Sequence, residues 1–206
     1  MSPISDRPIL FLAFANDRAD GSRYLRNLAE EARLLLDVLR PLELAGLCEA
    51  VLRQNVTLDG LFSFLTDPGY HGRITLFHFG GHADSYRLLF ETAHGQPAAA
   101  HAGGFAAFLG GLPALRIVFF NGCSTADQVQ GLLAAGIAAV IAPSQAIDDQ
   151  VATAFGTHFY QGLAVGDTIG KAFQQAEAAI QTVHGPEPRA YLVGDVDPAL
   201  ATAPAW

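Results

Sequence analysis

The stretch from Arg116 to Thr125 places the strongest constraint on how this chain folds. It begins with the bulky apolar run Ile117 to Phe120, which is typical of a strand buried on both faces in a parallel sheet. Gly122 permits a tight turn, so Cys123 is expected at the carboxyl end of the strand, just before a helix. The positive end of that helix favours a thiolate, which makes Cys123 a candidate nucleophile. The alternative is a small buried residue that fills a turn.

A second strand of the same kind ends in a histidine. Residues 74–79 are largely apolar and run into a Gly-Gly-His sequence that ends at His82. The interval between His82 and Cys123 is long enough for one crossover to a neighbouring parallel strand, so the two strand ends can meet. A histidine beside a cysteine supplies the base that a thiol needs, and the backbone N–H groups of Ala83 and Cys123 are candidate oxyanion donors. The sequence therefore predicts a His82–Cys123 dyad.

Length and composition indicate one apolar α/β domain. The chain has 206 residues, of which 50% are hydrophobic and 16% are charged, enough apolar material for a sheet covered on both faces. A net charge of −8 without a Lys/Arg cluster argues against nucleic acid or an anionic membrane as a partner. Two cysteines do not indicate a disulfide framework, and the apolar segment around Cys48 predicts a buried, inert thiol.

The apolar segment from Pro8 to Ala15 has some features of a signal peptide. Asp6 and Arg7 cancel in charge, so the basic flank of a signal peptide is missing, and the same residues are typical of a first buried strand. No later run reaches the length of a membrane span. We therefore expect a cytoplasmic protein.

Hydrophobic periodicity divides the rest of the chain into alternating helices and strands, the pattern of a parallel sheet. We expect helices over 25–39, 58–65, 103–109, 129–133, 148–163 and 167–183, and further strands over 47–52, 137–142 and around Tyr191. Pro41 is expected to end the first helix, Thr57 to cap the second and Asp167 to cap the last. The alternation over 86–91 predicts an exposed β-ribbon with its turn at His94-Gly95.

Other chemistry finds less support in the sequence. His78 and His82 have the spacing of two zinc ligands on a helix, but this segment is a strand and no third ligand clusters nearby. We expect no metal site, and His78 is predicted to be a core histidine. Asp84 is close enough in sequence to orient His82, although an exposed loop aspartate is the simpler interpretation. No phosphate-binding or dinucleotide motif appears, so no cofactor is expected.

Three motifs mark the carboxyl ends of predicted strands: Phe-Gly-Gly-His at 79–82, Asn-Gly-Cys-Ser-Thr at 121–125 and Ala-Pro-Ser-Gln-Ala-Ile-Asp-Asp at 142–149. Together they resemble the CHAT branch of the caspase-like cysteine peptidases. The resemblance implies a caspase-like three-layer α/β/α sandwich with a mostly parallel six-stranded sheet and a β-hairpin insert. It implies a peptidase domain over 1–196, followed by a Pro/Ala-rich tail or linker at 197–206, and it makes His82 and Cys123 the catalytic pair.

The resemblance also implies a cysteine endopeptidase with a protein substrate, an effector activated by a fused or separate sensor or repeat module, with bacterial defence or cell death as its setting. The Gln-Ala-Cys-x-Gly signature of true caspases is absent, so their preference for aspartate is not expected. Asn121, Asp17 and Asp195 lie at predicted strand ends and are expected to contact the substrate, favouring a basic or neutral side chain. The alternative for the two aspartates is plain exposure to solvent. A catalytically silent, caspase-like interaction module is the alternative.

Overall fold

A mostly parallel sheet forms the centre of the fold. The computed structural model describes residues 6–17, 24–92, 97–123, 125–185 and 189–193. Among these residues, the large sheet has six strands in the order β2-β1-β3-β6-β7-β8. Its strands are β1 (Ile9–Ala15), β2 (Glu49–Arg53), β3 (Ile74–Gly81), β6 (Ile117–Asn121), β7 (Ala139–Pro143) and β8 (Arg189–Val193). All neighbours pair in parallel except β8, which runs antiparallel to β7.

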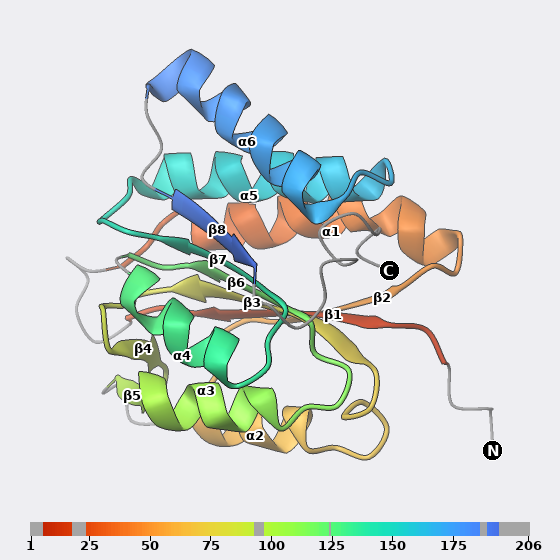
Figure 1. Cartoon of the computed structure of the whole chain (residues 1–206), viewed down its shortest axis with the longest axis vertical. Helices are drawn as coiled ribbons and strands as arrows, with labels where there is room; N and C mark the ends of the chain where they lie inside the picture. The colour runs from red at the N-terminus through yellow and green to blue at the C-terminus, as the bar shows by residue number, and fades with distance from the viewer. Residues whose placement is uncertain (1–5, 18–23, 93–96, 124, 186–188, 194–206) are drawn as a thin grey trace.

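Helices cover both faces of this sheet (Figure 1). One face is covered by α1 (Leu28–Leu44), α5 (Asp149–Ala164) and α6 (Ile169–His184). The other is covered by α2 (Leu58–Leu65), α3 (Ala102–Gly110), α4 (Val129–Ala134) and the antiparallel hairpin of β4 (Arg87–Phe90) and β5 (Ala98–His101). The predicted three-layer α/β/α sandwich with a β-hairpin insert is therefore confirmed.

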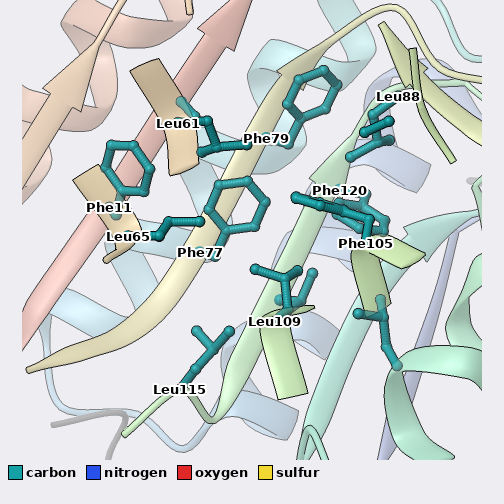
Figure 2. Close-up of a cluster of buried hydrophobic side chains, with 14 of the residues drawn as sticks. Phe11, Leu61, Leu65, Phe77, Phe79, Leu88, Phe105, Leu109, Leu115 and Phe120 are labelled. Atoms are coloured by element: carbon teal, nitrogen blue, oxygen red, sulfur yellow. The ribbon is translucent and has the colours of Figure 1, made fainter. Parts of the chain in front are cut away.

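Each face of the sheet has its own hydrophobic core. Successive side chains of a strand point to opposite faces, so Phe120 packs toward α3 whereas Phe119 packs toward α5. Figure 2 shows the first core, in which Phe77 and Phe79 of β3 and Phe120 of β6 gather with side chains of α2 (Leu61, Leu65) and α3 (Phe105, Leu109). Burial on both faces explains why the central strands are continuous apolar runs rather than alternating ones.

Several local expectations are confirmed. The Thr57 side chain caps α2 by accepting a hydrogen bond from the Gly60 N–H at 3.1 Å. The chain leaves α4 through Gly136, whose φ of +97° suits glycine. Cys48 is 0% exposed, and burial raises the pKa of its thiol to about 11, which makes it inert at neutral pH. His78 is likewise buried in the core.

Pro41 does not end the first helix, contrary to expectation. α1 continues to Leu44, and the Pro41 carbonyl accepts a hydrogen bond from the Ala45 N–H at 3.0 Å. A proline removes one intrahelical hydrogen bond, but near the end of a helix few later residues depend on it. The packing of Leu42, which is buried against the sheet, favours the extra turn.

Two further expectations need correction. Thr168 rather than Asp167 caps α6, because its hydroxyl accepts from the Lys171 N–H at 3.3 Å while the Asp167 carboxylate pairs with the Lys171 ammonium. The β4–β5 ribbon is not an exposed arm, since Leu88 and Phe90 are 0% and 1% exposed and belong to the first core. The predicted turn at His94-Gly95 and the tail at 197–206 lie outside the described residues.

Candidate active site

The strands that carry His82 and Cys123 are direct neighbours in the sheet. β3 and β6 pair in parallel, and Gly80 stands opposite Asn121. His82 lies two residues after Gly80, and Cys123 lies two residues after Asn121. Both residues therefore follow the carboxyl ends of their strands, on the same side of the sheet. Both are half-buried, which leaves each side chain partly accessible to solvent. The structure therefore brings together the two residues that the sequence paired.

Glycine at position 122 allows the two strand ends to touch through their backbones. A Cβ atom at Gly122 would lie 2.6 Å from the Gly81 carbonyl oxygen and 2.7 Å from the Ala83 Cβ. These separations are shorter than real Cβ contacts, so only glycine fits without movement of one strand end. The peptide units next to His82 and Cys123 are consequently in van der Waals contact.

Hydrogen bonds from both sides fix the turn that contains His82. The His82 carbonyl accepts from the Leu89 N–H at 2.9 Å, which ties the turn to β4. The side-chain amide of Gln128, in the short 3-10 helix η1 (Ala126–Gln128), donates to the Asp84 carbonyl at 2.7 Å. Gln128 is only 4% exposed, so this link between the two turns is well shielded from water. Gln128 carries no sequence signal for this role, since only the fold reveals its partner.

The two predicted oxyanion donors are the backbone N–H groups of Ala83 and Cys123. The bridge between Ala83 and Leu88 is closed by hydrogen bonds of the flanking residues, so the Ala83 N–H is not used by it. Among the residues that the structure describes, no acceptor is found for the N–H of Ala83 or of Cys123. Available N–H groups beside a nucleophile are what an oxyanion needs.

The surroundings of Cys123 differ in one respect from expectation. The nucleophile was expected just before a helix, but η1 begins only at Ala126 and α4 at Val129. The dipole of α4 therefore acts on the thiol from farther away, and such effects fade beyond the first turn. The thiol contacts the segment that precedes α5 instead, with its Sγ 3.9 Å from the Ile147 carbonyl oxygen.

Asp149, at the start of α5, is a carboxylate whose pKa responds to the charge of His82. Burial is the main reason why the pKa of Asp149 lies above its ordinary value, and the charge of His82 acts in the opposite direction. One Asp149 oxygen accepts from the Asn27 N–H at 3.0 Å. Asp84 is the other residue that the sequence offers for orienting His82, but its Oδ2 lies 2.6 Å from a guanidinium nitrogen of Arg87. Hydrogen bonds from Arg87 and from the Tyr86 N–H lower the pKa of Asp84. The Asp-Asp doublet at 148–149 was the only sequence signal for this acid.

Two of the three residues predicted to contact the substrate are described by the structure, and both are buried. Asn121 is 5% exposed, and its amide N–H groups donate to Glu31 at 2.6 Å and to the Ala152 carbonyl at 3.0 Å. Asp17 is also 5% exposed, and Asp195 lies outside the described residues. The Asn121 amide thus serves the interior of the protein rather than a substrate.

Metal chemistry gains no support from the residues that the structure describes. In that part of the chain no group of three or more His, Cys, Asp or Glu side chains is arranged to hold a metal ion. The ring of His78, once paired with His82 by its spacing, lies in the core and contacts Tyr160 and Glu31.

Comparison with known proteins assigns the chain to a family. A family model described as the CHAT domain matches residues 2–193. The chain belongs to the CHAT domain family. No curated protein matches the chain. Within the described ranges, no helix of this CHAT domain is long and apolar enough to cross a membrane.

Solved structures share the fold of this CHAT domain. The Drosophila initiator caspase Dronc is similar with a TM-score of 0.63 at 13% identity, covering 96% of this chain and 83% of that chain. The Arg-specific cysteine proteinase gingipain R is similar with a TM-score of 0.63 at 11% identity, covering 98% of this chain and 48% of its own. The CHAT domain therefore spans about half of the gingipain chain. At these identities the likeness establishes the fold, and the caspase-like fold expected from the sequence is confirmed.

Proposed function

We propose that this CHAT domain is a cysteine endopeptidase in which Cys123 is the nucleophile and His82 the general base and then acid. The observation that carries the proposal is the backbone contact at Gly122, which joins the turns of His82 and Cys123 at one edge of the sheet. Two half-buried groups of complementary chemistry at neighbouring strand ends form the minimal machinery for acyl transfer. Family membership and the fold support the same reaction.

The proposed reaction proceeds through a thioester. His82 takes the proton of the Cys123 thiol, and the sulfur attacks the carbonyl carbon of the scissile peptide bond. The developing oxyanion accepts hydrogen bonds from the N–H groups of Ala83 and Cys123. His82 then gives its proton to the leaving amine, and the Asp149 carboxylate supports the transient imidazolium. Water activated by His82 hydrolyses the thioester and restores the free thiol.

Substitution of the dyad tests this function. Cys123→Ala and His82→Ala should each abolish peptide hydrolysis while far-UV circular dichroism stays unchanged, and the double variant should be no worse than either single one. Cys48→Ser should retain full turnover, since Cys48 is buried far from solvent. Undiminished hydrolysis by Cys123→Ala would refute the proposal. A wild-type protein whose Cys123 resists a thiol-directed acyl probe would instead support the silent interaction module.

We further propose that a sensor or scaffold module raises the activity of this domain. The segment 144–148 is largely exposed, and it presents the Ile147 carbonyl to the Cys123 thiol, so a partner that binds this segment acts directly on the nucleophile. If the competent arrangement were about 1% populated without the partner, full activation would raise the rate roughly a hundredfold. The measurement compares turnover with and without the module encoded beside or fused to the domain. Equal turnover would show that the domain is constitutively active.

A further inference from the structure

A carboxylate lies buried directly beneath the candidate active site. Glu31, in the first turn of α1, is 1% exposed, whereas the neighbouring Glu30 has an exposed side chain that pairs with Arg33. An ionised carboxylate inside a protein costs several kcal/mol unless its oxygens are paired. The residues that pair with Glu31 therefore indicate its role in the protein.

One oxygen of Glu31 contacts both strands of the candidate site. Its Oε1 accepts from the Asn121 amide at 2.6 Å and lies 3.2 Å from Nε2 of His78. Asn121 is the last residue of β6, which leads to Cys123, and His78 lies in β3, which leads to His82. The contact with His78 lacks the alignment of a good hydrogen bond, so its attraction is mainly electrostatic.

The His78 ring is held in place by its other neighbours. It stacks on Phe119 with ring centroids 4.9 Å apart, and its Nδ1 lies 3.2 Å from the Tyr160 hydroxyl. Burial and the Glu31 charge raise the pKa of Tyr160 well above its ordinary value, so the hydroxyl stays protonated and can donate a hydrogen bond to Nδ1. When the hydroxyl donates in this way, the neutral imidazole carries its hydrogen on Nε2, beside the Glu31 carboxylate.

Asn121 is fixed from two helices at once. One amide hydrogen goes to Glu31 of α1 and the other to the Ala152 carbonyl of α5. Gly156 of α5 packs against this arrangement, where even a Cβ would be in ordinary van der Waals contact with the Glu31 oxygen at 3.4 Å and the Asn121 amide nitrogen at 3.7 Å. The backbone turns at Gly122 immediately after this anchored residue, so the position of Asn121 sets where Cys123 leaves the sheet.

We propose that Glu31 is a positioning residue that holds Cys123 in register with His82, acting through Asn121 on β6 and through His78 on β3. This inference rests on the proposed function, because it concerns the geometry of the same dyad. A common oxygen atom anchors both strands behind the site, so a loss of its charge allows the two strand ends to move relative to each other. Misplacement by about 1 Å costs on the order of a hundredfold in rate when it affects reacting groups.

The primary test compares Glu31→Gln with Glu30→Gln, a matched control one position away on the exposed side of α1. For both variants we would measure the unfolding midpoint, kcat and KM for a peptide substrate, and the rate of Cys123 alkylation by iodoacetamide at fixed pH. Mass spectrometry distinguishes Cys123 from Cys48, which serves as the buried internal standard. We expect Glu31→Gln to lower kcat and the Cys123 alkylation rate by about tenfold or more, with KM within about twofold, and Glu30→Gln to leave all of these unchanged.

A rescue variant separates positioning from general destabilisation. Asn121→Asp places a second carboxylate against Glu31 and should lower kcat and alkylation further, because two buried like charges repel. In the variant that combines Glu31→Gln with Asn121→Asp, the amide at position 31 can donate to the carboxylate at position 121. We expect its kcat and alkylation rate to be about tenfold higher than those of Asn121→Asp alone. The proposal is overturned if folded Glu31→Gln matches Glu30→Gln within about twofold in kcat and alkylation, or if the combined variant folds without recovery.

The alkylation rate also separates this inference from the proposed function. It is measured without a substrate, so it reports the environment of Cys123 whether or not the protein cleaves peptides. Slower alkylation in Glu31→Gln and its recovery in the combined variant would support positioning even if the wild type hydrolysed no peptide. An active wild type with an unaltered Glu31→Gln variant would leave the peptidase proposal standing and remove Glu31 from the mechanism.

Discussion

Asp149 lowers the stability of the folded protein at neutral pH and, in the proposed mechanism, supports the charge on His82. Burial, with Glu31 and Asp148 nearby, raises its pKa, so the folded state binds its proton more readily than the unfolded chain does. Its favourable contribution to folding is therefore complete below the ordinary pKa and is lost as pH rises through the folded pKa. At neutral pH the ionised carboxylate is retained at some expense of stability, which is the pattern of a functional group.

Substitution of Asp149 by asparagine should separate the two effects. The carbonyl oxygen of the introduced amide can still accept from the Asn27 N–H, so Asp149→Asn should be at least as stable as the wild type at pH 7 and show a smaller loss of stability from pH 4 to 7. Activity should fall about tenfold, as expected for roughly 1.4 kcal/mol of lost support for the imidazolium. Asp84→Asn is the control, because that carboxylate is exposed and bound to Arg87, and it should stay near wild-type activity. Equal activity of the two variants would exclude Asp149 from the mechanism.

At the scale of secondary-structure elements, the contact between the ends of β3 and β6 makes position 122 a sensitive one. Gly122→Ala forces a Cβ against the Gly81 carbonyl and Ala83, and relief requires the strand ends to separate. We expect a loss of about 1–3 kcal/mol in unfolding free energy and a marked loss of activity. Gly103→Ala, in α3 with nothing within 4 Å of the new methyl group, should instead stabilise the protein by about 0.5–1 kcal/mol. Denaturant unfolding of both variants checks this contrast.

The elements that follow from local pattern were predictable, and those that depend on distant partners were not. Continuous apolar runs ending in glycine located β3 and β6, and with them His82 and Cys123. The alternation in β4 showed that one of its faces is apolar but not that this face enters the core. Neighbouring Asp167 and Thr168 are both good caps, and the sequence does not show that the Asp167 carboxylate pairs with Lys171 while the Thr168 hydroxyl caps the helix.

The contacts of Glu31 with Asn121 and His78 were the least predictable part of the candidate site. Glu31 lies between Leu28 and Leu35 on the apolar face of α1, and a charge at that position is a signal for a buried functional group. Its partners Asn121 and His78 come from strands far along the chain, so no local pattern links them. The sequence shows that Asn121 stands two places before the cysteine but not which way its side chain points, so it predicts a contact with the substrate instead of one with Glu31.

For the whole molecule, net charge predicts the kind of substrate that is favoured. The chain carries 20 Asp and Glu against 12 Lys and Arg, a net charge of −8. Peptides with lysine or arginine near the cleavage point should have higher kcat/KM than matched neutral peptides, and the advantage should shrink as salt shortens the Debye length from about 10 Å at 0.1 M to about 3 Å at 1 M. Matched peptides assayed across this salt range provide the measurement. A strong preference for aspartate at low salt would contradict the prediction.

The reversed direction of β8 decides where another module can be joined to this domain. β1 starts at Ile9 on the edge of the sheet remote from His82 and Cys123. Because β8 runs opposite to its neighbour, with Val193 paired to Ala139, it finishes on the same remote edge. The described chain therefore enters at Ile9 and leaves at Val193 on the side of the sheet opposite Cys123, and a module joined directly at either point would begin there rather than beside the thiol.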